Sequence, residues 1–224
     1  MVTGVTEMPL TWSVVIPVKV LARAKSRLAG LAGPARPELA LAMAADTVRA
    51  AAACPVVATV VVVTDDPEAA SALAELGARV VADEPDAGLN PALAHGAAVA
   101  AATWPDRGTA AMAADLPALR PAELDRGLRA AAQWPEAFVA DAAGTGTVLL
   151  AAPPGQPLDP RFELGSATAH ERSGARALTG DWPGLRQDVD TPADLAAVVA
   201  LGAGRHTCEL LRDLGLTPDC APAA

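Results

Sequence analysis

Residues 13–28 read S-V-V-I-P-V-K-V-L-A-R-A-K-S-R-L, an apolar strand followed at once by a cationic segment. The β-branched first half is typical of a buried strand. The second half supplies four cations, Lys19, Arg23, Lys25 and Arg27. No Asp or Glu occurs between Glu7 and Glu38 to neutralise them. A strand that ends in a cationic turn before a helix is suited to holding a polyphosphate, and a solvated basic loop is an equally good interpretation of these residues alone.

Composition indicates a globular protein. The chain has 224 residues, of which 52% are hydrophobic and 19% charged, enough for one domain with a substantial core. The net charge of −9 argues against a general binder of nucleic acid or membrane surfaces. We expect no signal peptide, no membrane span and a cytoplasmic location. Cys54, Cys208 and Cys220 show no metal-like spacing, which suits a reduced compartment.

Apolar runs alternate with helical stretches along the chain. Strands are predicted at residues 13–18, 56–63, 78–82, 109–114, 137–140, 148–152 and 185–190. Helices are predicted at 37–53, 66–76, 90–103, 121–133, 192–201 and 208–214, with a short one from residue 166. The strands are apolar on both faces. This alternation predicts an α/β fold in which helices flank a mostly parallel central sheet.

Polar side chains follow many of the predicted strands. In an open parallel sheet, ligands bind beyond the carboxyl ends of the strands. Several charged residues are therefore expected to share one rim of the sheet: Lys19, Lys25, Asp65, Asp115, Asp141, Asp188 and Asp190.

Asp188 and Asp190 flank Val189. In a strand both carboxylates would point to one face, with the valine directed to the core. Two carboxylates so close repel each other unless a cation lies between them, and Mg²⁺ held by carboxylates and substrate phosphates suits that arrangement. The alternative is that Asp190 or Thr191 caps the helix that begins at Pro192, which would explain one of the two acids and leave Asp188 without a role. Asp115 is a third candidate metal ligand, or a turn residue.

Two glycine-containing turns are candidate anion sites. Residues 144–147, G-T-G-T, can expose successive backbone N–H groups, although a tight turn between strands explains them at least as well. Gly165 and Ser166 precede a helix whose N-terminus attracts anions. His170 on that helix is interpreted as structural, and Asn90 as a helix N-cap. No nucleophile–base pair or Walker motif accompanies them, so the set favours phosphoryl-type transfer by positioning and charge neutralisation.

Seven motifs occur in the order found in one known family. They are I-P-V-K (16–19), A-K-S-R-L (24–28), G-L-N-P-A-L (88–93), D-L-P-A-L (115–119), G-T-G-T (144–147), G-S-A-x-x-H (165–170) and D-V-D-T-P-x-D-L (188–195). Together they resemble the guanylyltransferases CofC and FbiD of deazaflavin coenzyme (F-420) biosynthesis. The resemblance covers residues 12–207, with 1–11 and 208–224 as terminal extensions. It implies a single-domain, Rossmann-like nucleotidyltransferase of the glycosyltransferase-A type.

The resemblance also implies a reaction. Enzymes of this family join GMP from GTP to the phosphate of a small three-carbon acid and release pyrophosphate. Candidate acceptors are phosphoenolpyruvate, 2-phospho-L-lactate and 3-phosphoglycerate. The partners implied are GTP, one such acid and a downstream enzyme that consumes the labile product. A homodimer is a further expectation, and no nucleic acid or membrane is implied.

Site residues follow from the matching motifs. The family's three aspartates hold the acceptor with Mg²⁺, and they match Asp115, Asp188 and Asp190. Acceptor-binding positions match Thr147 and Ser166, with Gly165 beside them. The family usually has glycine where this chain has Glu163, at a position whose backbone contacts the acceptor. The Glu163 side chain is therefore expected to point away from the acceptor's charge.

We therefore expect a Mg²⁺-dependent guanylyltransferase whose catalytic residues are Lys25 and the three aspartates. Lys19, Arg23, Lys25 and Arg27 would neutralise the triphosphate, and Asn90 would contact the base or ribose. Two alternatives remain open. One is a nucleotidyltransferase with another acceptor, such as a molybdopterin or sugar phosphate, although the glycine-rich opening loop of those enzymes is missing here. The other is a nucleotide-binding subunit without turnover.

Overall fold

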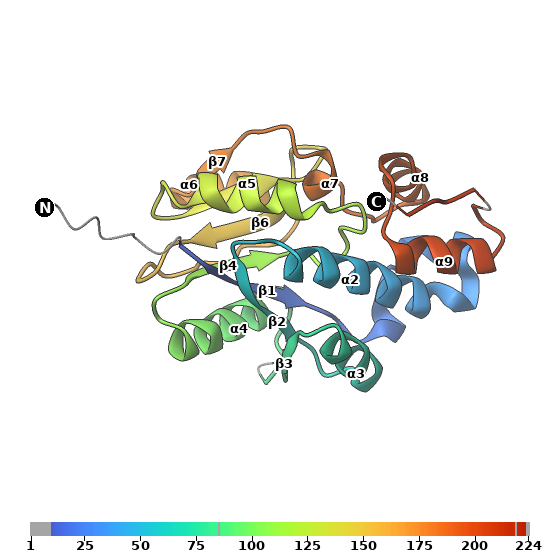
Figure 1. Cartoon of the computed structure of the whole chain (residues 1–224), viewed down its shortest axis with the longest axis horizontal. Coiled ribbons are helices and arrows are strands. Elements are labelled where there is room, and N and C mark those ends of the chain that lie inside the picture. The colour runs from blue at the N-terminus through green and yellow to red at the C-terminus, as the bar shows by residue number, and fades with distance from the viewer. Residues whose placement is uncertain (1–9, 85, 218, 223–224) are drawn as a thin grey trace, which may run out of the picture.

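A seven-stranded sheet with helices on both faces organises the chain (Figure 1). The computed structural model describes residues 10–84, 86–217 and 219–222. The strands are β1 (Trp12–Pro17), β2 (Val57–Val63), β3 (Arg79–Val81), β4 (Gly108–Met112), β5 (Ala137–Ala140), β6 (Thr147–Ala152) and β7 (Arg176–Leu178). The helices are α1 (Ala29–Ala32), α2 (Arg36–Ala52), α3 (Pro67–Glu75), α4 (Leu89–Thr103), α5 (Pro121–Ala131), α6 (Ser166–Ser173), α7 (Pro183–Arg186), α8 (Pro192–Leu201) and α9 (Arg205–Asp213). None of these helices is both long and apolar enough to cross a membrane.

The strand order is β3-β2-β1-β4-β6-β5-β7. Only β6 runs antiparallel to its two neighbours, β4 and β5, because a tight turn joins it to β5; the other pairs in the sheet are parallel. The prediction of an α/β fold with a mostly parallel sheet is therefore confirmed. The carboxyl ends of β1, β2, β4 and β5 and the amino end of β6 consequently meet at one rim, where the predicted site residues gather.

Alternate residues of β1 supply both cores. Val14 and Ile16 pack on one face with residues of α2, α3 and α5, whereas Val15 packs on the other face with residues of α4 and α6. Gly96 lets α4 lie close to the sheet, since a Cβ atom there would come within 2.6 Å of Val15 and Val63 side chains. Burial on both faces is why these strands are continuously apolar.

The prediction of a last strand at residues 185–190 is wrong. The first residues of this segment belong to the short helix α7, and the rest lies outside the sheet without regular secondary structure. Val189 is nevertheless buried while Asp190 is exposed, so the alternation expected for a strand persists without strand pairing. The edge position is taken instead by β7, which sequence analysis missed because it is only three residues long and largely exposed.

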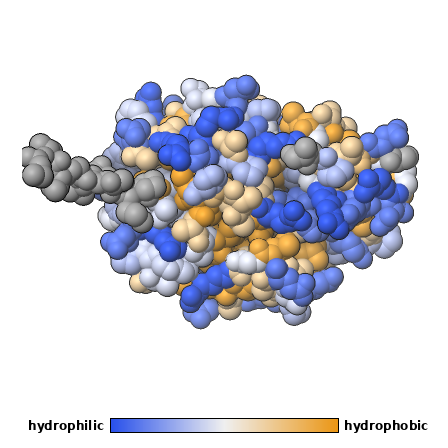
Figure 2. Space-filling model, in the orientation of Figure 1, coloured by the Kyte–Doolittle hydropathy of each residue, from blue (hydrophilic) through white to orange (hydrophobic). Residues whose placement is uncertain are grey.

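The C-terminal helices lie together at one end of the molecule (Figure 1). Hydrophobic residues gather near the centre of the face shown in Figure 2, whereas hydrophilic residues cover much of the end where α9 lies. The buried side of α9, including Cys208 and Leu211, packs in a core shared with Leu39 and Met43 of α2.

A disulfide joins Cys208 of α9 to Cys220. The expectation of a reduced cysteine set is therefore wrong for these two residues, while Cys54 is a buried free thiol. The chain turns back after α9 and brings the two α-carbons to 5.2 Å, a proximity that their spacing in the sequence does not reveal.

Asp46 of α2 forms hydrogen bonds with the first residues of α9. Its buried carboxylate accepts hydrogen bonds from the backbone N–H groups of His206 (3.0 Å) and Thr207 (2.8 Å) and contacts His206 Nδ1 at 2.9 Å. We expect Asp46→Ala to lower the free energy of unfolding by about 2–3 kcal/mol, because it leaves helix N-terminal donors buried without partners. Urea denaturation measures this loss.

Glu209→Ala provides a matched control on the same helix. Glu209 pairs with Arg205 at 2.8 Å on the surface, and exposed pairs of this kind contribute roughly 0.3–0.5 kcal/mol. Equal losses in the two variants would contradict the role assigned to Asp46.

Candidate active site

A cleft of about 700 Å³ opens at the carboxyl rim of the sheet. It is formed by the loop after β1, the residues after β4, the β5–β6 turn, the loop before α6 and the stretch after α7, together with residues of α2 and α4. Its lining includes most of the predicted site residues: Lys19, Arg23, Lys25, Arg27, Asp115, Thr147, Glu163, Gly165, Ser166, Asp188 and Asp190. Asp141 lines it as well, but Asp65 and Asn90 do not. The sheet topology thus brings together residues up to 171 positions apart, from 19 to 190.

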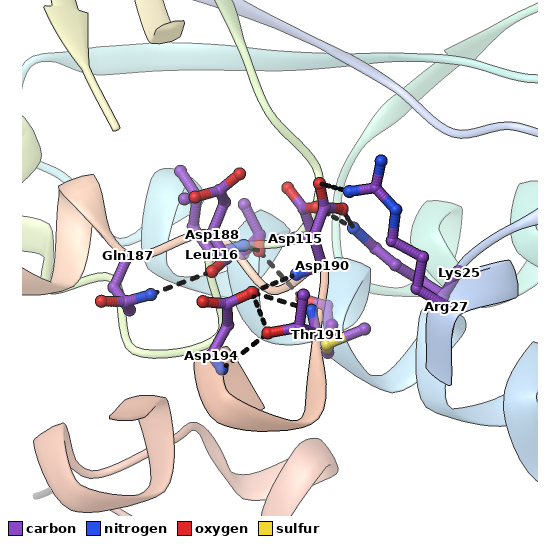
Figure 3. Close-up of polar contacts among 11 residues, drawn as sticks. Lys25, Arg27, Asp115, Leu116, Gln187, Asp188, Asp190, Thr191 and Asp194 are labelled. Atoms are coloured by element: carbon purple, nitrogen blue, oxygen red, sulfur yellow. Dashed lines mark hydrogen bonds and ion pairs between the residues drawn. The ribbon is translucent and has the colours of Figure 1, made fainter. Parts of the chain in front are cut away.

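Lys25 lies between two of the aspartates (Figure 3). Its ammonium forms an ion pair with Asp115 and a second with Asp190 Oδ1 at 3.0 Å, while its side chain is only 14% exposed. Arg27 reaches Asp190 from the same side, at 3.5 Å. Burial lowers the pKa of Lys25, but the two carboxylates outweigh it and the pKa is raised overall. Lys25 is therefore a permanent cation between anions.

The backbone of Lys25 is itself unusual. Its φ of 51° lies in the left-handed region, which residues other than glycine seldom occupy and which is often found at functional sites. Two short 3₁₀ turns, Leu21–Arg23 and Ser26–Leu28, surround it in place of a regular helix. The Arg36 guanidinium, at the start of α2, donates a hydrogen bond to the Ala24 carbonyl and so connects this loop to α2.

Asp188 is a carboxyl group whose ionised form is disfavoured by its surroundings in the cleft. Burial, followed by the charges of Asp115, Asp141 and Asp190, raises the pKa of Asp188 to about 7. Lys25 compensates Asp115 and Asp190, but no ion pair with Asp188 occurs among the described residues. A carboxylate held near other carboxylates favours an added cation.

The donor set at this position suits a hard divalent cation. Carboxylate oxygens are the ligands that Mg²⁺ prefers. The described residues contain no group of three or more acidic, histidine or cysteine side chains already arranged as a metal site, and Lys25 lies where such a cation would be expected. The close approach of Asp115 and Asp190 to Asp188 and their oxygen ligands fit Mg²⁺, once the Lys25 ammonium moves away from Asp115 and Asp190.

Neighbouring elements fix the Asp188–Asp190 segment. Arg186 donates to the Ala140 and Asp141 carbonyls at 3.1 and 2.8 Å, and buried Glu123 accepts the Leu185 N–H at 2.8 Å. The N-cap of α8 is Thr191, in a capping box with Asp194. Of the two predicted caps, Thr191 is therefore confirmed and Asp190 is wrong, so the Asp190 carboxylate is available to the cleft.

The G-T-G-T turn proves to be a hairpin turn. The Asp141 carboxylate accepts the N–H groups of Thr145 (2.9 Å) and Gly146 (2.8 Å), and the Asp141 carbonyl accepts that of Gly144. These donors are consumed inside the protein, so the predicted anion site on the turn backbone is wrong. What the turn gives to the cleft is the side chain of Thr147 at the start of β6.

The loop before α6 forms the opposite wall. The Ser166 N–H donates to the Glu163 carbonyl at 2.9 Å, and the Ala167 N–H donates to the Thr145 carbonyl at 3.1 Å. The first donors of α6 are thereby occupied, so Ser166 can offer a ligand its hydroxyl rather than its backbone. The Glu163 N–H is also engaged, with the Arg161 carbonyl.

Asn90 lies outside the cleft and forms a hydrogen bond with the loop before α6. Its Oδ1 accepts the Phe162 N–H at 2.6 Å, and the N-cap of α4 is Gly88, so the interpretation of Asn90 as the N-cap is wrong. Asp65 similarly accepts the Asp83 N–H away from the cleft.

Sequence reasoning missed Glu123, Arg186 and the role of Asp141 as a turn anchor. No local pattern marks these roles, because each residue acts on a segment at least four residues away. His170, interpreted from the sequence as structural, is buried and hydrogen-bonded, and its contact with Thr147 across 23 positions could not be read from the sequence.

Comparison with known proteins places this geometry in a family. The family model described as "Guanylyl transferase CofC like" matches residues 12–223. A phosphoenolpyruvate guanylyltransferase of Thermomonospora curvata is 62% identical over 202 residues, covering 90% of this chain and 89% of the relative. One of Streptomyces coelicolor is 58% identical over 200 residues, covering 88% and 94%.

Solved structures share the fold at low identity. A proposed nucleotide-diphospho-sugar transferase from Desulfovibrio desulfuricans G20 aligns with a TM-score of 0.69 and 17% identity, over 92% of this chain and 96% of that one. A nucleotidyl transferase from Methanothermobacter thermautotroptrophicus aligns with a TM-score of 0.59 and 20% identity, over 85% and 96%. These similarities concern the fold alone.

Proposed function

This chain belongs to the family of CofC-like guanylyl transferases, and on that premise we propose that it transfers GMP from GTP to the phosphate of phosphoenolpyruvate. Pyrophosphate and a guanylylated three-carbon acid are the products. The observation that supports this most directly is the opposition of a cationic loop to three aspartates across one cleft. Such a cleft can hold a triphosphate and a second anionic substrate together.

The acceptor phosphate oxygen attacks the α-phosphorus of GTP, and the bond from that phosphorus to the β-phosphate bridging oxygen breaks. Because the nucleophile is already an anion, no side chain has to remove a proton. Lys19, Arg23, Lys25 and Arg27 neutralise the triphosphate and then the departing pyrophosphate.

Mg²⁺ is the proposed cofactor, held by Asp115, Asp188 and Asp190. When bound, it offsets the charge shared by the two substrates. On the acceptor side, the hydroxyl groups of Thr147 and Ser166 are the proposed donors to the acid, with Gly165 forming the turn beside them. The contact of Asn90 with the base or ribose stays a prediction that requires movement of its loop.

The guanylylated acid is the substrate proposed for a downstream enzyme of deazaflavin coenzyme biosynthesis. The alternatives are another phosphorylated acceptor, such as 2-phospho-L-lactate or 3-phosphoglycerate, and a nucleotide-binding subunit without turnover.

The test is pyrophosphate release from GTP and Mg²⁺ with each acid offered separately, in the presence of the downstream enzyme and the deazaflavin precursor as a trap. We expect release with phosphoenolpyruvate and GTP, but not with ATP or CTP. Release with a different acid would replace the acceptor and keep the reaction. Binding of GTP without release in any mixture would favour the non-catalytic subunit.

A further inference from the structure

His170 is buried on α6 with both ring nitrogens in use. Nδ1 lies 2.9 Å from Thr147 Oγ1, and Nε2 accepts the backbone N–H of Arg161 at 3.0 Å. Phe138 and Phe162 enclose the ring, with centroids at 5.7 and 5.4 Å, and the side chain has no solvent exposure. The ring therefore connects β6 to the loop that forms the opposite wall of the cleft.

These partners determine the tautomer. A backbone N–H can only donate, so Nε2 must be unprotonated. Burial lowers the pKa of His170 to about 4; the Ser166 backbone partly offsets this effect, and the charges of nearby Arg161 and Asp159 act more weakly and in opposite directions. The ring is thus neutral near pH 7 with its single proton on Nδ1, and Nδ1–H donates to Thr147 Oγ1.

The direction of this hydrogen bond decides what Thr147 can offer a ligand. Its oxygen accepts from His170, so its own hydroxyl proton is left for another partner. No other partner of that hydroxyl occurs among the described residues, and Thr147 lines the cleft. With the opposite tautomer, Thr147 would donate to Nδ1 and turn only lone pairs toward the cleft.

We propose that His170 is a positioning residue for the acceptor acid. As the Nδ1–H tautomer it holds the Thr147 hydroxyl as a donor aimed into the cleft, where a phosphate or carboxylate can only accept. Through Nε2 it also fixes the chain at Arg161, next to Phe162, which Asn90 holds from the other side. This inference rests on the proposed function, because it deepens the assignment of the acceptor side of the same cleft.

Two substitutions test the roles of His170 Nδ1 and Nε2 separately. The amide of His170→Asn lies near the position of Nδ1 and can still donate to Thr147, whereas that of His170→Gln reaches the position of Nε2 and can only replace the contact with Arg161. We expect His170→Gln to raise KM for the acceptor about tenfold and to leave KM for GTP unchanged, with His170→Asn within about threefold of wild type. An equal rise in both KM values, or an unchanged acceptor KM in His170→Gln, would overturn the proposal.

A double-mutant cycle tests whether His170 acts through Thr147. Thr147→Val removes the hydroxyl, while Thr147→Ser retains it as a control. If the proposal is right, adding His170→Gln to Thr147→Val causes no further rise in acceptor KM. A full additional tenfold rise would show that His170 acts by another route.

The tautomer of His170 can be determined by NMR in the wild-type protein, without an activity assay. The ¹⁵N chemical shifts of the ring should show a protonated, pyrrole-type Nδ1 and a pyridine-type Nε2, and replacement of His95 and His206, the other two histidines, assigns the signals. The reverse pattern, or two pyrrole-type nitrogens, would overturn the inference even if the variants did not fold. If the wild type releases no pyrophosphate with any acid, the proposed function fails while this reading still stands.

Discussion

Replacing Asp188 with asparagine is expected to lower the rate of pyrophosphate release by about a thousandfold or more. Asp188 has no ion-pair partner among the described residues, and burial and the neighbouring carboxylates raise its pKa to about 7. Asparagine keeps the shape of the side chain but removes the charge that attracts a divalent cation. The Mg²⁺ concentration needed for half-maximal rate should rise as well, and steady-state assays over a range of Mg²⁺ measure both effects.

Thermal unfolding shows whether Asp188→Asn loses activity through loss of its charge or through loss of the fold. Because Asp188 lies among like charges, we expect Asp188→Asn without metal to be at least as resistant to thermal unfolding as wild type. Asp181→Asn, an exposed aspartate just before α7, is the matched control and should keep wild-type kinetics. Near-normal turnover in Asp188→Asn would remove Asp188 from the proposed cation site.

The position of the cleft at the carboxyl rim of the sheet was predictable, because it depends on the topology of the sheet rather than on individual side-chain contacts. Alternating apolar strands and helices predict a parallel sheet, and the carboxyl ends of parallel strands meet at one edge whatever their register. Lys25 and Asp115 are 90 positions apart, yet both follow a strand of the sheet and therefore meet. The same reasoning placed Asp141 at the cleft. Asp188 and Asp190 also line the cleft, but the strand on which their placement was predicted does not form.

Hydrogen-bond direction and partner choice were not predictable. The G-T-G-T turn has the composition of an anion site, but the carboxylate of Asp141 already occupies its N–H groups. Asn90 has the composition of a cap, but Gly88 occupies that position and Asn90 braces Phe162 instead. In each case tertiary neighbours decide between two local interpretations that the sequence leaves equally good.

Lys25→Met is expected to have two opposite effects. It should lower kcat/KM for GTP about a hundredfold or more, because a buried cation facing the polyphosphate is lost. It should also raise the affinity of the nucleotide-free protein for Mg²⁺ or Mn²⁺ about tenfold, because the ammonium no longer competes for Asp115 and Asp190. Steady-state kinetics measure the first effect, and calorimetric titration with the metal salt measures the second.

Lys19→Met tests whether metal affinity rises because the Lys25 ammonium no longer competes with the metal, or because any loss of a positive charge raises it. Lys19 is the other lysine of the chain and lines the same cleft, but it is exposed and forms no ion pair with a described carboxylate. Its replacement should weaken the use of GTP and leave metal affinity almost unchanged. If Lys25→Met bound metal no better than Lys19→Met, Lys25 would not be holding the place of the cation. If only Lys25→Met gained affinity, Asp115 and Asp190 would bind lysine in the free protein and metal during turnover, and this exchange would account for the strained backbone at residue 25.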